Sequence, residues 1–237
     1  MQAAIMQPTY LPWIGYLAMI DRVDVFVFLD SVAFSDRSWQ QRNYIRAGDE
    51  KRLLTVPVLK KGRRGQAIRD VEISPDGAFP GDHIRAIERA YAKAPYFDAY
   101  APALFEIMER EHARLCDMTL AVTRWLMAGF GLDTPTMRSS EIAVDGAKAD
   151  LLADICRELG ADRYLSAPGS RDYIEESEAF EQAGIAVEYH HYDHPEYSQI
   201  GDGFIPYLGS IDLLFNEGGE RGAAILRAGV AAGEPAA

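Results

Sequence analysis

Three histidines and an aspartate stand close together near the C-terminal end of the sequence. His190 ends residues 185–190, whose composition is typical of a strand, and His191, Asp193 and His194 follow. A histidine titrates near neutral pH and an adjacent carboxylate can orient its ring, so the cluster suits general acid–base chemistry. Structural hydrogen bonding and a zinc or iron site are the alternatives. His190 and His191 point to opposite faces of a strand, so at most one of them shares a site with His194.

His83 is a further candidate, at the start of the first helix of an expected helical layer. It would complete a pair of proton donor and acceptor if it reached the same pocket. Its alternative role is that of a first-turn residue whose partner is Asp82. The catalytic candidates are therefore His194, His83 and His191.

The loop after the first expected strand is a second region suited to binding. In an open parallel sheet, ligands bind outside the carboxyl ends of the strands, where helix N-termini offer free N–H groups. Two prolines stiffen this loop, and Gly15 lets the backbone or a ligand approach the following helix closely. Alternatively, Pro12 only sets the helix start and Trp13 packs in the core. The substrate-binding residues predicted here are Gln7, Tyr10, Trp13 and Tyr16.

A third group of residues follows the second expected strand. It combines aromatic faces, amides and a guanidinium, which suits stacking on a base or sugar and pairing with a carboxylate or phosphate. The alternative is a packed aromatic corner in which Arg42 forms a salt bridge with Asp30. The predicted substrate-binding residues are Asp30, Trp39, Gln40, Arg42 and Asn43.

Four polar residues and a tyrosine complete the candidate site. Lys148, in a turn at a helix start, is a candidate anion ligand together with Ser139 and Ser140, and its alternative is a solvated lysine. Tyr197 and Gln199 lie beside the histidine cluster. The sequence has no GxSxG or P-loop motif, and its two cysteines lie in helix-like apolar patterns. We therefore predict no covalent nucleophile, no metal and no cofactor.

The elements that position these residues alternate between strands and helices. The pattern predicts strands at 2–6, 24–29, 52–58, 163–166 and 185–190, with a weaker one at 71–74. It predicts helices at 13–23, 148–159, within 172–182 and at 210–215, and helical periodicity from 82 to 130. We expect an α/β fold with one mainly parallel sheet of Rossmann-like type and an inserted helical layer. Residues 1–220 would form one α/β domain with the helical insert at about 81–131, followed by a flexible or helical tail at 221–237.

Composition narrows the class of partner. A formal net charge of −12 argues against a nucleic-acid binder, because the only basic run, Lys60 to Arg64, is short. That run is either a solvated loop or a flap over an anionic ligand. The sequence has neither a signal peptide nor an apolar stretch long enough to span a membrane, so we expect a cytoplasmic protein. A small-molecule substrate is the expected partner, and a homodimer is left open.

Two resemblances extend these expectations. The order strand, PxWxGY, helix, strand is similar to the PxHxGH arrangement of nucleotidyltransferases of the HIGH superfamily, which makes a HIGH-nucleotidyltransferase-like sheet one variant of the fold. Trp13 and Tyr16 stand in place of the two histidines and cannot stabilise a phosphoryl transition state as cations. This departure argues against adenylate chemistry but not against a nucleotide-sized pocket.

The whole chain resembles the WbqC-like protein family. The resemblance is carried by QPTYLPWIGY, DVFVFLDSVAFSDRSWQQRNYI, TVPV, YAKAPYF, GADRYLSAPGSRDYI, HPEYSQ and FIPYLGSIDLLFNEG. It implies a bacterial cytoplasmic protein of O-antigen or other surface-polysaccharide biosynthesis. The expected activity is transfer of an acyl or aminoacyl group to an amino sugar or a nucleotide-linked sugar. The alternative is a non-catalytic accessory module that binds a nucleotide-linked ligand or a partner enzyme.

Overall fold

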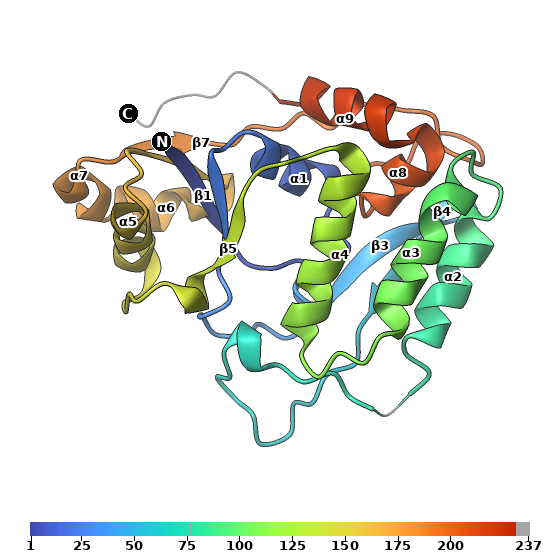
Figure 1. Cartoon of the computed structure of the whole chain (residues 1–237), viewed down its shortest axis with the longest axis horizontal. Coiled ribbons are helices and arrows are strands. Elements are labelled where there is room, and N and C mark those ends of the chain that lie inside the picture. The colour runs from blue at the N-terminus through green and yellow to red at the C-terminus, as the bar shows by residue number, and fades with distance from the viewer. Residues whose placement is uncertain (76, 231–237) are drawn as a thin grey trace.

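A five-stranded parallel sheet forms the centre of the molecule (Figure 1). The computed structural model describes residues 1–75 and 77–230 of the 237-residue chain. In spatial order the strands are β5 (Thr136–Arg138), β2 (Val25–Phe28), β1 (Gln2–Met6), β6 (Arg163–Ser166) and β7 (Ala186–Tyr189). The predicted α/β fold with a mainly parallel, Rossmann-like sheet is confirmed.

The strand order places a topological switch point beside β1. The chain builds outward from β1 through β2 to β5, and then returns to the other side of β1 with β6 and β7. The loops after β1 and β6 therefore leave the sheet in opposite directions. A crevice opens between such loops at the carboxyl ends of the strands, and it is the usual ligand site of this architecture.

Successive side chains of each strand point to opposite faces of the sheet and pack into two apolar layers, one on each face. Ala4, Phe26, Phe28 and Leu165 face one layer, and Ala3, Ile5, Val27 and Tyr164 face the other. The first layer contains α1 (Ile14–Asp21), α4 (Leu115–Phe130), α8 (Ile211–Glu217) and α9 (Gly219–Ala228). The second contains α5 (Lys148–Glu158), α6 (Arg171–Glu175) and α7 (Ala179–Ala183).

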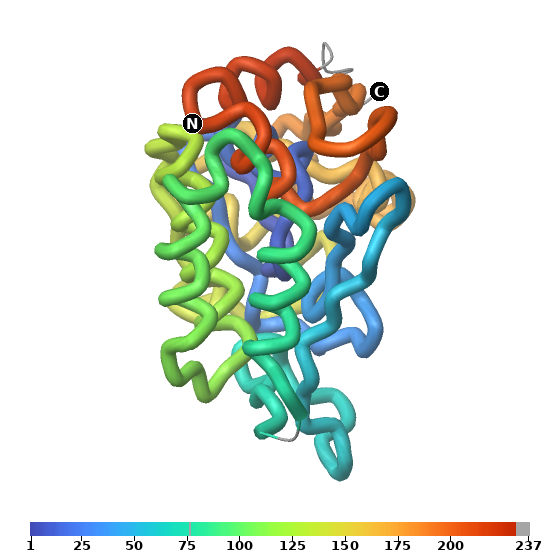
Figure 2. Tube along the Cα trace, turned by 90° about the vertical axis from the view of Figure 1, so that its right-hand side faces the viewer, coloured from blue at the N-terminus to red at the C-terminus, as the bar shows by residue number. Residues whose placement is uncertain are grey.

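The helical periodicity after residue 81 corresponds to three helices. These are α2 (Gly81–Tyr91), α3 (Phe97–Glu109) and α4, which lie between β4 and β5 in the sequence and contribute to the first apolar layer. Figure 2 shows the layer of green helices alongside the blue β3–β4 hairpin. Short 3-10 turns occur at Ile68–Asp70, Ser139–Glu141 and Pro168–Ser170.

The predicted strand at 52–58 was wrongly placed in the parallel sheet. β3 (Arg42–Ala47) and β4 (Glu50–Thr55) instead form a separate antiparallel hairpin that turns at Gly48, whose φ is +65°. Residues 42–47, for which the sequence predicted no strand, therefore form one. Its alternation was hard to recognise because a charged residue, Arg46, is buried at 2% exposure. Residues 71–74 form only isolated bridges, and β5 is too short for a periodic signal.

The chain ends in a packed helix as far as it is described. α9 contacts α1, α4 and α8, so the tail expected at 221–237 begins within this helix. Residues 231–237 of that tail lie outside the described residues. None of the described helices is long and apolar enough to cross a membrane.

Candidate functional site

Three adjoining cavities lie at the carboxyl end of β1, where the strand order reverses. Met6, the last residue of β1, lines all three of them. Their other walls come from the loop after β1, the segment after β7, the β3–β4 hairpin and the loop after β6. The site therefore occupies the position that parallel α/β architecture favours for ligands.

The first cavity, which we call the aromatic cavity, has a volume of about 340 Å³. Its lining is dominated by aromatic rings, and Trp39 and Tyr207 are 52% and 55% exposed. The lining residues are Met6, Thr9, Trp13, Tyr16, Trp39, Asn43, Tyr44, Lys51 and Tyr207.

The second cavity, the histidine cavity, has a volume of about 300 Å³ and shares Met6, Trp13 and Tyr16 with the first. The segment after β7 forms its other wall. Its lining residues are Met6, Trp13, Gly15, Tyr16, Met19, Ala167, Pro168, His190, His191, Tyr192 and Asp193.

The third cavity, the crossover cavity, lies between the carboxyl ends of β1 and β6 and measures about 370 Å³. Gln7, Trp39 and Gln40 line it together with Thr9, Ser170 and Tyr173. The structure thus brings residues of three separately predicted segments, after β1, β2 and β7, to one edge of the sheet.

Direct contacts hold the histidine segment against the N-terminal loop. His190 Nε2 lies 3.0 Å from the carbonyl oxygen of Gly15, and the ring of His194 stacks on Trp13 with centroids 6.2 Å apart. Trp13 also forms an isolated antiparallel bridge with Gly209. Trp13 and Gly15 of the segment after β1 therefore contact both the histidine segment and the loop before α8.

Gly15 is required by Trp13 rather than by a ligand. A Cβ atom at this position would lie 2.2–2.6 Å from ring atoms of the Trp13 indole. A side chain at residue 15 would therefore displace the indole from the wall shared by the two cavities. The close approach that the sequence suggested exists, but the approaching group is the neighbouring side chain.

His194 has both ring nitrogens engaged. Nδ1 donates to the carbonyl oxygen of Pro195 at 3.0 Å, and Nε2 accepts the backbone N–H of Tyr207 at 3.2 Å. Burial lowers the pKa of His194, with the Pro195 hydrogen bond partly opposing that shift. In this arrangement His194 is a neutral ring that holds Tyr207.

His83 and His190 are buried, at 7% and 6% exposure. Nδ1 of His83 lies 2.8 Å from the hydroxyl of Tyr10. Arg22 donates to Nδ1 of His190 at 3.1 Å, which leaves Nε2–H to donate to Gly15. Both histidines connect separate segments of the fold, and neither offers a free nitrogen acceptor to a ligand.

These two buried histidines predict a loss of stability in mild acid. Desolvation lowers the pKa of each from 6.5 to about 4, so between these pH values the unfolded chain binds protons that the folded chain does not. The stabilisation is complete above pH 6.5 and is lost as pH falls towards 4. We expect each histidine to contribute about 2 kcal/mol to the decrease in unfolding free energy between pH 7 and pH 5. Urea unfolding at both pH values measures this decrease.

The variant His190→Gln isolates one of these contributions. Its unfolding free energy should fall less between pH 7 and pH 5 than that of the unmodified protein, because the His190 contribution is missing. The carboxylates titrate alike in both chains and do not affect the difference. An equal loss in the two proteins would show that His190 is already protonated in the folded state near pH 6.

His191 differs from the other histidines. Its Nε2 is the buried ring nitrogen that has no hydrogen-bond partner within residues 1–75 and 77–230. It lines the histidine cavity beside Asp193 and Tyr16. The lone pair or proton on this nitrogen is therefore not engaged by a hydrogen bond within the described part of the chain.

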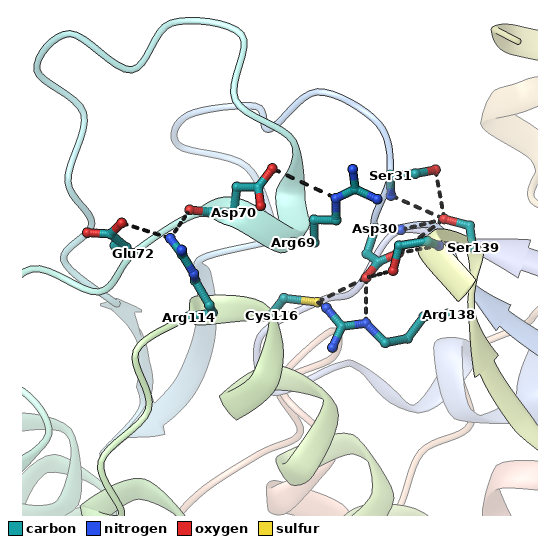
Figure 3. A network of polar contacts seen from close by, with 10 residues as sticks. Asp30, Ser31, Arg69, Asp70, Glu72, Arg114, Cys116, Arg138 and Ser139 are labelled. Carbon is teal, nitrogen blue, oxygen red and sulfur yellow. Dashed lines mark hydrogen bonds and ion pairs between the residues drawn. The ribbon is translucent and has the colours of Figure 1, made fainter. Parts of the chain in front are cut away.

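Asp30 is held by partners within the protein. Its carboxylate is fully buried and accepts Arg138 Nε at 2.6 Å, the Ser140 N–H at 2.9 Å and the Ser140 hydroxyl at 3.0 Å. Ser139 Oγ in turn accepts the backbone N–H groups of Asp30 and Ser31. Figure 3 shows Arg138, Ser139 and Cys116 converging on Asp30. The salt-bridge partner is Arg138 and not Arg42, and none of these side chains lines the three cavities.

The amide side chains of the predicted set shape the loop after β1. Gln40 donates to Gln7 Oε1 at 2.7 Å, and Asn43 Nδ2 donates to the carbonyl oxygens of Tyr10 and Leu11. Leu11 has a φ of +45°, in the left-handed region that non-glycine residues rarely adopt. The Asn43 amide therefore helps to hold a strained turn beside the cavities.

The remaining predicted residues lie outside the three cavities. Tyr197 and Gln199 donate to the buried carboxylate of Asp212, and Arg46 donates to Gln199 Oε1. Arg42 lies on β3, and its Nε is buried with no hydrogen-bond partner among the described residues. Lys148 is exposed at the start of α5. Tyr197 and Gln199 thus anchor the segment that carries Tyr207.

The basic run after β4 also lies outside the cavities. Lys60 pairs with Asp36 at 2.5 Å, and Arg63 pairs with Glu72 at 2.8 Å. Both pairs join this loop to neighbouring loops, which supports the interpretation as a solvated loop.

The sequence analysis missed several lining residues, among them Tyr44, Lys51 and Tyr207 of the aromatic cavity. Tyr44 and Lys51 lie on the same face of the hairpin, which was not predicted as a hairpin. Tyr207 lies in the FIPYLG block, and its position could not be derived because the loop before α8 is irregular. Within the described residues, no group of three His, Cys, Asp or Glu side chains is placed to hold a metal ion.

Comparison with known proteins gives a family but no activity. Residues 7–224 match the model of the WbqC-like protein family. The chain is 34% identical over 222 residues to the uncharacterized protein Rv1507c of Mycobacterium tuberculosis (strain ATCC 25618 / H37Rv), which covers 92% of this chain and 95% of that protein. No solved structure gives a significant match. The match spans the loop after β1, the histidine segment and the helices between them, and the chain belongs to the WbqC-like protein family.

Proposed function

We propose that this protein is a transferase that moves an acyl or aminoacyl group onto the amine of an amino sugar carried by a nucleotide. The product would be a precursor of O-antigen or another surface polysaccharide. Family membership supports the pathway, and the cavities at the switch point support a substrate of this size.

The observation that carries the proposal is the position of His191. His191 lines the histidine cavity, which shares Trp13 and Tyr16 with the aromatic cavity, and its buried Nε2 has no hydrogen-bond partner among the described residues. A base must lie within reach of the proton that it removes. A substrate that occupies both cavities would place one end beside aromatic rings and the other beside His191.

The chemical step follows from this arrangement. The amine nitrogen of the sugar attacks the carbonyl carbon of an activated acyl or aminoacyl ester or thioester, and the C–N bond forms. His191 Nε2 accepts the proton that the nitrogen loses. The C–O or C–S bond to the leaving group then breaks, the leaving group departs with the electron pair, and His191 returns the proton to it. His191 therefore ends the cycle in its starting form.

Each of the other catalytic candidates would have to give up a hydrogen bond to act as a base. Nδ1 of His83 and Nε2 of His194 face donors in the folded chain. We assign them to positioning: His83 fixes Tyr10 in the loop after β1, and His194 fixes Tyr207 at the aromatic cavity. Histidines that are held in hydrogen bonds within the protein are also expected in an accessory binding module. Binding without turnover is therefore the second candidate function.

The test combines the pure protein with a set of amino-sugar nucleotides and acyl donors. We expect a mass gain equal to one acyl or aminoacyl group on the amino sugar, detected by mass spectrometry of the reaction mixture. A matched sugar nucleotide with a hydroxyl in place of the amine is the control and should gain no mass. Tight binding of the amino sugar without a mass change would favour the accessory module. If neither binding nor transfer were detected, both functions would be excluded.

A further inference from the structure

We propose that the aromatic cavity is a subsite for the base of a nucleotide, in which stacking on Trp39 and Tyr207 holds the base and Lys51 contacts the phosphates. The inference rests on the proposed function, because it assigns the nucleotide end of that substrate. It adds that the site accepts different bases with similar affinity.

The first support is the concentration of exposed aromatic and apolar side chains around this cavity. Trp39, Leu53 and Tyr207 are three of the five large hydrophobic residues that are exposed in the described residues. Leu53 is the cross-strand partner of Tyr44, so it lies on the hairpin face that forms the cavity wall. Exposed aromatic side chains that line one cavity are suited to a flat, apolar-faced ligand.

The second support is the way in which Tyr207 is held. Its φ is +61°, a conformation that costs a non-glycine residue free energy. The backbone N–H is fixed by His194 Nε2, and the ring lies 5.7 Å from the centroid of Trp13. Such strain persists where surrounding contacts impose it and is common at ligand sites. The structure thus fixes a half-exposed ring at the mouth of the cavity.

The third support is the scarcity of free polar groups in the cavity wall. Asn43 donates to two backbone carbonyls and accepts the N–H of Tyr44, and the Thr9 hydroxyl donates to the carbonyl of Gln7. A sugar ring requires many hydrogen-bond partners, whereas a base presents a large π face. The wall therefore favours the base over the sugar, and it provides few groups that could distinguish one base from another.

Lys51 supplies the local positive charge. Its Nζ lies 5.7 Å from the ring centroid of Tyr207, and it forms no ion pair within the described part of the chain. In a protein with a net charge of −12, an unpaired lysine beside a cavity is a favourable contact for an anion. A nucleoside diphosphate combines such an anion with a flat base.

The experiment measures binding of UDP, dTDP, GDP and ribose 5-phosphate by calorimetry. We expect Kd values for the three nucleotides within about 10-fold of each other and much weaker binding of ribose 5-phosphate. Trp39→Leu and Tyr207→Leu should each weaken UDP binding by about 10-fold or more, and Trp39→Phe should restore most of the affinity because it keeps a π face. Lys51→Gln should weaken binding of UDP but not of uridine.

The matched control is Tyr96→Leu, because Tyr96 is 44% exposed but does not line the three cavities. Equal effects of Tyr96→Leu and Trp39→Leu would overturn the inference, as would ribose 5-phosphate binding as tightly as UDP, or a preference for one base of more than about 100-fold. The proposed function fails separately. If nucleotides bind as expected but no acyl group is transferred, the transferase proposal fails and the subsite proposal stands. If a free amino sugar is acylated as fast as the nucleotide-linked one, the subsite proposal fails and the transferase proposal stands.

Discussion

Replacing His191 with glutamine is expected to lower the rate of acyl transfer by about 100-fold or more, while the sugar nucleotide still binds. Glutamine has nearly the size of histidine and can hydrogen-bond, but it cannot accept a proton at neutral pH. The unpartnered Nε2 of His191 makes no hydrogen bond within the described chain that the fold would lose. We therefore expect kcat, measured by mass spectrometry, to fall, and Kd, measured by calorimetry, to stay nearly unchanged.

Two further histidine variants make this result specific. His112→Gln alters a histidine whose Nε2 lies 2.7 Å from the Ile107 carbonyl oxygen and which lines none of the three cavities, so turnover should be unchanged. His194→Gln should raise Kd more than it lowers kcat, because it releases the backbone N–H of Tyr207. If His194→Gln abolished turnover and His191→Gln did not, the catalytic base would have to be His194.

The sheet could be predicted from the sequence because its signals are local. The apolar run of β1 and the helical spacing after Trp13 together indicate a parallel crossover, and the structure contains one. β3 gave no such signal, since Arg46 is buried through hydrogen bonds to Gln199 and to the backbone of the 202–203 turn. Its burial depends on partners more than 150 positions away in the sequence, and no periodic pattern carries that information.

The candidate site was predictable in part for the same reason. Residues that follow a strand, such as Gln7 and His191, can be assigned to the carboxyl edge of a sheet from spacing alone. Which histidine is free could not be predicted, because that depends on Arg22, Gly15 and Tyr207, whose sequence separations from their histidines, 168, 175 and 13, follow no pattern. The polar residues Asp30 and Ser139 illustrate the opposite case, since their residue types suit binding but their hydrogen bonds are made within the protein.

Replacing Asp30 with asparagine is expected to lower the free energy of unfolding by about 3 kcal/mol, the lower end of the cost of breaking a buried ion pair. The carboxylate is fully buried, and its ion-pair partner Arg138 is 22% exposed, so some of the lost interaction is replaced by water. Burial raises the pKa of the neighbouring Cys116 thiol to about 12, so that group stays neutral and does not add a second negative charge. Urea unfolding at pH 7 measures the change.

A matched variant tests whether burial, and not the loss of one negative charge, causes that effect. Asp117 pairs with the same guanidinium, at 2.9 Å, but its side chain is 47% exposed. Asp117→Asn should therefore cost less than about 1 kcal/mol. Equal costs for the two variants would contradict the structural role given to Asp30. A stable Asp30→Asn protein that had lost sugar-nucleotide binding would instead give this carboxylate a part in substrate binding, either by contact with the ligand or by positioning a group that contacts it.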